Sequence, residues 1–216
     1  MALYLGIDPT TSESKPSGCA VLDGSAALIH VGRVSTDAEI ISLSERWSPE
    51  VVAIDSPLFL PRGLCCLDEG CSHSCCNVWA GEKRVAEREL YRQGIRLYWT
   101  TRKTFIKAMI YRSMELRRTL EAQGISVIEV YPYASKVRLF ECSIPKKTTK
   151  AGRQWLQERL EGLVPGLREH GRLLSHDELD AIVAAYTAYL HGQGQAEAVG
   201  DPREGVIYVP RGRAVQ

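Results

Sequence analysis

The chain has 216 residues, which suffices for one sizeable hydrophobic core and is short for two, so we expect a single domain over residues 1–216. The formal net charge is +1, which excludes a global basic field and limits any contact with nucleic acid to a local patch. No stretch approaches the roughly 20 apolar residues that span a bilayer, and the N-terminus lacks the features of a signal peptide. These properties predict a cytoplasmic protein with no membrane segment.

The first quarter of the chain shows short apolar runs separated by turn residues. A hairpin is indicated by an Asp-Gly-Ser turn, and a helix start by the capping box Thr36-x-x-Glu39. Apolar, β-branched runs that end in an acid are typical of buried strands. The expected elements are strands at 2–8, 18–23, 26–34 and 51–56, and a helix from 36 to about 47.

The rest of the chain alternates helical and extended patterns. Residues 57–82 hold proline, glycine and cysteines and are expected to form a loop or insertion. Gly94 and Gly124 each end a predicted helix. The expected elements are helices at 83–93, 103–123, 133–140, 151–163 and 175–191, a short extended run at 95–100, a strand at 125–132, and a last edge strand at 205–210.

The order of these elements predicts an α/β fold. An early hairpin argues against a purely doubly wound sheet, because adjacent antiparallel strands precede the alternating strands and helices. We therefore expect a mixed central sheet, with antiparallel hairpin strands first and parallel βαβ units after them, and with helices on both faces.

Three acids lie at or near the ends of predicted buried strands: Asp8, Asp55 and Glu129. Strand ends are where open α/β sheets bind ligands. Burying several carboxylates together is unfavourable unless a cation joins them, and hard oxygen ligands suit Mg²⁺ or Mn²⁺. For Asp8 alone, followed by Pro-Thr-Thr-Ser, a role in the turn is an equal alternative.

A fourth acid, Asp180, is predicted on a helix that begins near Ser175 with the capping box Ser175-x-x-Glu178. Asp177 and Asp180 are three residues apart and share a face of that helix. The helix dipole alone explains Asp177, which is therefore only a possible additional site residue. Asp180 precedes an alanine-rich segment that predicts close packing on the sheet. The sequence thus predicts metal binding by Asp8, Asp55, Glu129 and Asp180.

Five of the seven cysteines fall within twelve residues: Cys65, Cys66, Cys71, Cys75 and Cys76. In a cytosolic chain this density favours a metal over disulfides. Four thiolates, with His73 as an alternative ligand, would bind Zn²⁺ tetrahedrally, and an iron–sulfur cluster uses the same ligand type. The alternative is a patch of reduced cysteines with no metal. A structural zinc ion that fixes the 57–82 loop beside Asp55 is the simplest hypothesis.

Basic residues occur in two groups, and each group is a candidate for binding the phosphates of a nucleic acid. The group on the predicted helix 103–123 is more typical of a solvated helix face. In the second group, Lys146 and Lys147 precede two threonines and a predicted helix N-terminus, which favours phosphate binding. Tyr98 and Trp99 are of a type that stacks on bases, but we expect both to pack in the core.

Several segments together resemble a family of predicted ribonuclease H-like nucleases, a domain-of-unknown-function family related in fold to RuvC and YqgF. The segments are GIDPTTS, AIDSPLFLP, VIEVYPYAS, SHDELDAIVAAYTAYL and GVIYVP, with residues 87–98 and IPKKTTKAGR in addition. The resemblance covers nearly the whole chain and implies a ribonuclease H-like fold with a metal-dependent nuclease site. It matches Asp8 to the first-strand acid, Asp55 to the I-D-x-P-L acid, Glu129 to the E-x-Y-P acid and Asp180 to the helical D-A acid. The cysteine-rich segment departs from simpler members.

Three functions follow as hypotheses. The first is a metal-dependent nuclease acting on DNA or RNA, in which Asp8 and Asp180 bind one ion, Asp55 and Glu129 complete the pair, and the lysines at 146–147 hold phosphate. The second is a non-catalytic nucleic-acid or protein-binding regulator organised by a cysteine-bound metal. A degraded catalytic site would lack one of the four acids, so the presence of all four counts against this hypothesis. The third is a phosphotransferase of the actin and sugar-kinase type, which the short chain and the lack of a second glycine-rich phosphate loop disfavour.

Overall fold

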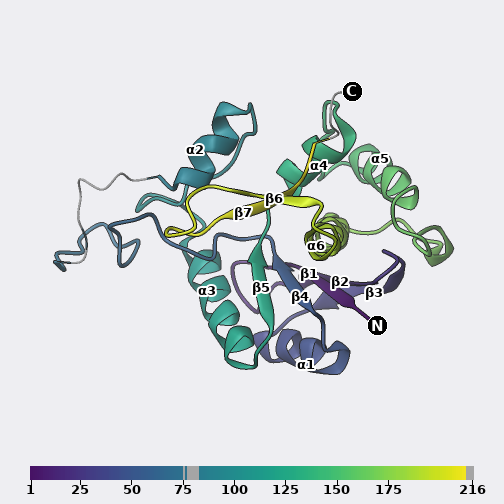
Figure 1. Ribbon diagram of the computed structural model, residues 1–216, viewed down its shortest axis with the longest axis horizontal. Helices are drawn as coiled ribbons and strands as arrows, with labels where there is room; N and C mark the ends of the chain where they lie inside the picture. Colours follow the sequence, from purple (N-terminus) through teal and green to yellow (C-terminus); the bar gives the residue numbers. More distant parts are fainter. Residues whose placement is uncertain (75, 77–82, 213–216) are drawn as a thin grey trace.

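The computed structural model describes residues 1–74, 76 and 83–212. Its centre is a mixed five-stranded sheet in the order β3-β2-β1-β4-β5. The three N-terminal strands form antiparallel pairs, whereas β4 and β5 run parallel to β1 (Figure 1). The strands are β1 (Leu3–Asp8), β2 (Ser17–Asp23), β3 (Leu28–Val34), β4 (Val51–Ile54) and β5 (Ser126–Glu129).

Helices cover both faces of this sheet. Helix α6 (His176–Gly192) crosses one face and contacts β1, β2 and β4. Helices α1 (Asp37–Trp47) and α3 (Lys107–Ala122) cover the other, where Ile40 and Leu116 pack on Leu5 and Ile7 of β1. The mixed sheet that the order of the elements predicts, with hairpin strands first and parallel βαβ units after, is confirmed.

Helix α6 lies unusually close to the sheet because β1 and β2 carry glycine beneath it. A Cβ atom added at Gly6 would lie 2.1 Å from the carbonyl oxygen of Ala181, and one at Gly18 would lie 2.1 Å from that of Asp177. Alanines at 181, 184, 185 and 188 supply the small surface of the helix. This close approach brings the first turns of α6 next to the end of β1.

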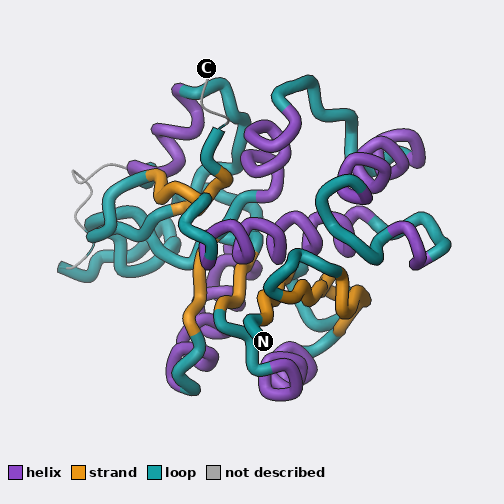
Figure 2. Tube along the Cα trace, turned by 45° about the vertical axis from the view of Figure 1, so that its right-hand side comes forward, coloured by secondary structure: helices purple, strands orange, loops and turns teal. Residues whose placement is uncertain are grey.

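The remaining elements lie on the α6 side of the sheet. Figure 2, turned by 45°, shows these further helices above the layer of the five-stranded central sheet. They are α2 (Val85–Arg92), α4 (Pro132–Phe140), α5 (Lys150–Glu161) and the 3-10 helix Arg168–His170. Strands β6 (Ala196–Val199) and β7 (Ile207–Pro210) form a separate antiparallel pair. Within the described part of the chain, no helix is both long and apolar enough to cross a membrane.

Two sequence-based expectations need correction. The expected last edge strand, β7, pairs with β6, an element that the sequence did not predict, and meets the end of β5 only through a parallel bridge between Val130 and Tyr208. Helix α3 begins at Lys107 rather than 103, so Arg102 and Lys103 precede it.

A carboxylate cluster at the edge of the parallel strands

Three carboxylates converge where β1, β4 and α6 meet. Asp8 is the last residue of β1, Asp55 directly follows β4, and Asp180 lies in the second turn of α6. One carboxylate oxygen of each lies within 4.8 Å of the others. Because side chains alternate along a strand, Asp8 shares the α6 face with Tyr4 and Gly6. Since β1 and β4 are parallel neighbours, their acids emerge side by side.

Burial sets the electrostatics of this cluster. It raises the pKa of Asp8 well above its usual range, and the negative charges of Asp55 and Asp180 raise it further. Burial likewise raises the pKa of Asp55 to about 7, against the opposing effect of Lys147. One oxygen of Asp8, Oδ2, is buried and has no hydrogen-bond partner among the described residues. An unpartnered buried carboxylate oxygen is costly, and a cation would satisfy it.

Asp180 differs from the other two acids because two lysines hold it. Lys136 Nζ of α4 donates to Oδ1 at 2.8 Å, and Lys147 Nζ donates to Oδ2 at 2.6 Å. Burial opposes ionisation of Asp180, but the two ammonium groups outweigh it and lower its pKa. The side chain of Lys136 is buried, whereas that of Lys147 is 45% exposed. Lys147 therefore has room to leave Asp180, and Lys136 does not.

Asp8 also belongs to a second group of possible metal ligands. His176 and Asp177, at the start of α6, each place a ligand atom within 4.8 Å of Asp8 and of each other. His176 Nδ1 lies 2.7 Å from Asp177 Oδ1. The two groups share Asp8, an arrangement that suits a carboxylate bridging two cations.

Glu129 does not join either group in the described residues, and its partners explain why. It shares a face of β5 with Val127, which packs on the α1 and α3 side, whereas Ile128 and Val130 face α6. Its Oε1 accepts a hydrogen bond from Arg84 at 2.6 Å, and its Oε2 accepts one from the backbone N–H of Leu58 at 2.8 Å. Glu129 is thus held by protein groups, although it lines the same cavity as Asp55 and Asp180.

The cluster lies in the wall of a cavity of about 470 Å³. Asp8, Asp55 and Asp180 contribute to the polar side of this cavity, together with Lys136, Lys146 and Lys147. The other lining residues are largely apolar or aromatic, and include Leu97, Tyr98, Ile106, Met109, Tyr131 and Tyr133. Tyr98 is 65% exposed at this cavity, so the expectation that it packs in the core is wrong.

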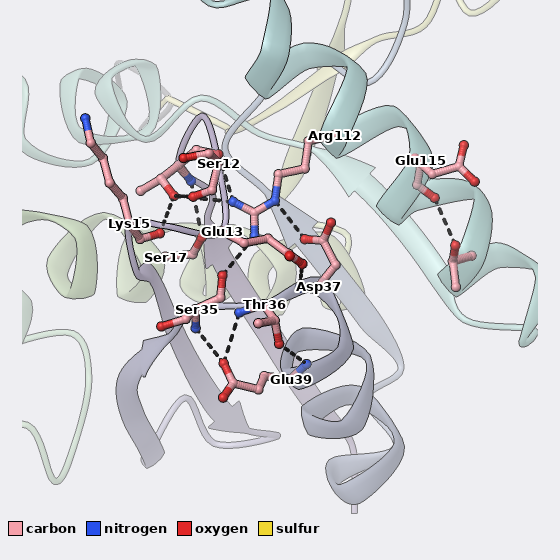
Figure 3. A network of polar contacts seen from close by, with 12 residues as sticks. Ser12, Glu13, Lys15, Ser17, Ser35, Thr36, Asp37, Glu39, Arg112 and Glu115 are labelled. Atoms are coloured by element: carbon pink, nitrogen blue, oxygen red, sulfur yellow. Dashed lines mark hydrogen bonds and ion pairs between the residues drawn. The ribbon is translucent and has the colours of Figure 1, made fainter.

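The loop that follows Asp8 is anchored by Arg112 of α3. The guanidinium donates to Asp37 Oδ1 at 2.8 Å and to the carbonyl oxygen of Thr10 at 2.9 Å (Figure 3). Glu13, in the same loop, accepts a hydrogen bond from the backbone N–H of Asp37. The side chain of Arg112 is only 9% exposed, so the solvated helix face expected from the sequence does not include it. Arg112 fixes the chain that leaves the end of β1.

The cysteine-rich segment places four thiols together, those of Cys65, Cys66, Cys71 and Cys76. The fifth predicted cysteine, Cys75, lies outside the described residues. His73, the alternative ligand, is not part of the group.

Sequence reasoning missed three residues of the site: Lys136, Arg84 and His176. Lys136 directly follows the VIEVYPYAS segment, and its side chain is buried. A lysine among apolar residues on a helix face was the available signal in the sequence. His176 is adjacent to Asp177 and was overlooked because the capping box accounted for the whole turn.

Comparisons with known proteins place the chain in a family. A structure of RuvC from Thermus thermophilus is similar, with 17% sequence identity, a TM-score of 0.48, and coverage of 89% of this chain and 96% of that one. No curated protein matches the sequence. The profile described as "Protein of unknown function (DUF429)" matches residues 6–205, nearly the whole chain. The chain therefore belongs to the DUF429 family.

Proposed function

We propose that this protein is a nuclease that hydrolyses phosphodiester bonds in nucleic acid with Mg²⁺ or Mn²⁺ bound by Asp8, Asp55 and Asp180. The observation that carries the proposal is the convergence of these three carboxylates in one cavity wall, with Asp8 Oδ2 buried and unpartnered. Asp177 and His176 are candidates for a second ion that shares Asp8. Glu129, held by Arg84, is assigned a positioning role.

The donor set fits a hard divalent cation, because carboxylate oxygens are the ligands that Mg²⁺ and Mn²⁺ prefer. When bound, such an ion supplies an activated water and stabilises the developing charge on the leaving oxygen. The protein's part is to hold the three acids close together and the substrate in place. Lys136 stays beside Asp180 as a fixed counter-charge, while Lys147 and Lys146 face the cavity and hold the scissile phosphate.

The cavity favours an unpaired nucleotide over an intact duplex. Its aromatic wall offers Tyr98, whose ring packs edge-on against Phe105, with the ring centroids 5.1 Å apart. Phe105 is 75% exposed, so the pair presents aromatic surface to solvent. Bases of single strands stack on such side chains without sequence preference. Lys103 and Lys107 flank Phe105 in the sequence and would contact the backbone of the same strand.

The deciding experiment compares wild type with Asp8→Asn on labelled single-stranded, duplex, hybrid and branched DNA and RNA, each with Mn²⁺, Mg²⁺ or no added metal. We expect metal-dependent cleavage by the wild type, fastest on substrates with unpaired nucleotides, and a loss of at least about a hundredfold in the variant. Equal activity in both proteins, or no cleavage by a folded wild type, would refute the proposal.

Removing the charge of Lys147 should separate metal binding from catalysis. Lys147→Gln is expected to bind Mn²⁺ more tightly, by on the order of tenfold, because the ammonium group no longer competes for Asp180. Cleavage should nevertheless fall, because a phosphate contact is lost. Calorimetric titration with Mn²⁺ measures the first effect, and Lys150→Gln, which removes an exposed lysine of α5, is the matched control. Weaker Mn²⁺ binding in Lys147→Gln would contradict this assignment.

A further inference from the structure

Four thiols form a compact group on the segment between β4 and α2. The Sγ atoms of Cys65, Cys66, Cys71 and Cys76 all lie within 4.8 Å of one another. Cys65 Sγ is 3.8 Å from Cys71 Sγ and 3.1 Å from Cys76 Sγ. No disulfide joins these four cysteines to one another.

These separations suit four ligands around one metal atom. With zinc–sulfur bonds of about 2.3 Å, the edges of a tetrahedral site are about 3.8 Å long. Thiolates around a cluster of several iron atoms lie further apart, because the iron and sulfide atoms occupy the space between them. The spacing therefore favours a single ion, and four protein ligands leave it no open position for chemistry.

The local backbone supports the same geometry. The N–H of Cys65 donates to Cys76 Sγ at 3.4 Å, an interaction that a thiolate accepts well. Two of the four cysteines each close a backbone turn, since Cys71 N–H donates to the carbonyl oxygen of Asp68 and Cys76 N–H to that of His73. Described residues 57–76 contain no helix or strand. Holding four partly exposed thiols together here costs conformational entropy that a bound ion would offset.

The group is attached to the molecule through Leu67. This side chain is fully buried and packs with Ile106 and Ile110. Its backbone N–H donates to the hydroxyl oxygen of Tyr111 in α3 at 2.6 Å. Ile106 and its neighbour Met109 also line the carboxylate cavity. An ion bound by the four thiols would thus fix one wall of that cavity.

We propose that Cys65, Cys66, Cys71 and Cys76 bind one structural Zn²⁺ ion, which holds the segment 57–76 against α3. The proposal does not depend on the nuclease activity, because the ligands are separate from the carboxylates and the ion has a structural role. Among the described residues it takes these four cysteines as ligands and leaves out His73.

The first test is the metal content of the full-length protein, purified under reducing conditions and analysed by mass spectrometry for zinc and iron. We expect about one zinc per chain and no visible absorption. Cys71→Ser and Cys76→Ser should each lose most of the zinc. Cys142→Ser, which alters an exposed cysteine outside the group, should retain it, as should His73→Ala. Iron in place of zinc, no metal, or equal loss in Cys142→Ser would overturn the proposal.

A second measurement keeps the test decisive if the serine variants fold poorly. Wild-type protein stripped of zinc and reloaded with Co²⁺ should show the intense visible and near-ultraviolet bands of tetrahedral cobalt thiolate, and added Zn²⁺ should abolish them. Removing zinc should also lower the melting temperature by about 5 °C or more, because the segment is released from α3. Octahedral cobalt spectra would contradict a four-thiolate site. Cleavage activity enters neither measurement, so the two proposals fail independently.

Discussion

Asp55→Asn is expected to make the metal-free protein more stable at pH 8 while reducing metal-dependent cleavage by on the order of a thousandfold. Burial is the main reason that the pKa of Asp55 is raised to about 7, and the charge of Asp180 adds to it. Above that pH Asp55 is ionised, and its carboxylate is solvated less well in the folded protein than in the unfolded chain. The neutral amide removes this cost, with an expected gain of roughly 1–3 kcal/mol in the free energy of unfolding.

The pH dependence gives the sign of the effect. Asp55 has its ordinary pKa of 3.8 when unfolded and a raised pKa when folded, so the folded state binds the proton more tightly. Stability contributed by this group is fully present below about pH 4 and is lost as the pH rises through about 7. Asp55→Asn should therefore match wild type at pH 4 and exceed it at pH 8.

Thermal unfolding without added Mg²⁺ or Mn²⁺ measures this difference. Glu158→Gln, which makes the same chemical change on the exposed face of α5, is the control and should be neutral at both pH values. Adding Mn²⁺ should raise the melting temperature of wild type and leave that of Asp55→Asn unchanged. A variant that is less stable than wild type at pH 8 would show that Asp55 is held by protein partners rather than reserved for a cation.

The carboxylate cluster could be anticipated because it depends mostly on local pattern. An acid that ends an apolar strand is visible in the sequence, and parallel strands bring such ends together. Asp180 follows from helical periodicity and the alanines beside it. Strand alternation also contains the information that separates Glu129: it shares a face with Val127, and the opposite residues Ile128 and Val130 face α6. Counting faces along β5 would have excluded it from the α6 side.

Other features depend on contacts between distant parts of the chain. The burial of Lys136 depends on Asp180, 44 residues later, which accepts a hydrogen bond from its ammonium group. Strand β6 has the four residues Ala-Glu-Ala-Val, which carry too little strand preference to be recognised without β7 beside them. The run at 95–100 has better strand composition, but no described strand pairs with it. In both cases, the presence or absence of a partner strand decided the outcome, and local strand propensity did not.

Arg84→Met is expected to destabilise the protein by about 3–5 kcal/mol, the largest stability effect among these substitutions. The Arg84 side chain is fully buried and donates to Glu129 Oε1 at 2.6 Å. Removing it leaves the buried Glu129 carboxylate without its counter-charge, while methionine keeps most of the volume. Arg84 is the N-cap residue of α2 but makes no side-chain cap bond, so the helix start is not perturbed directly. Arg92→Met, on the exposed side of the same helix, should change stability by less than about 0.5 kcal/mol.

The origin of that loss can be tested by pH and by a second substitution. Burial raises the pKa of Glu129, and Arg84 opposes the rise. Without Arg84 the pKa of Glu129 rises further, so the variant should lose more stability at high pH, where Glu129 is ionised, than at low pH, where protonation removes its charge. Glu129→Gln added to Arg84→Met should recover about 2 kcal/mol or more, as measured by urea unfolding of wild type, Arg84→Met, Glu129→Gln and the double variant. If the double variant is no more stable than Arg84→Met, the loss comes from packing around the guanidinium, and Glu129 is not the group that requires it.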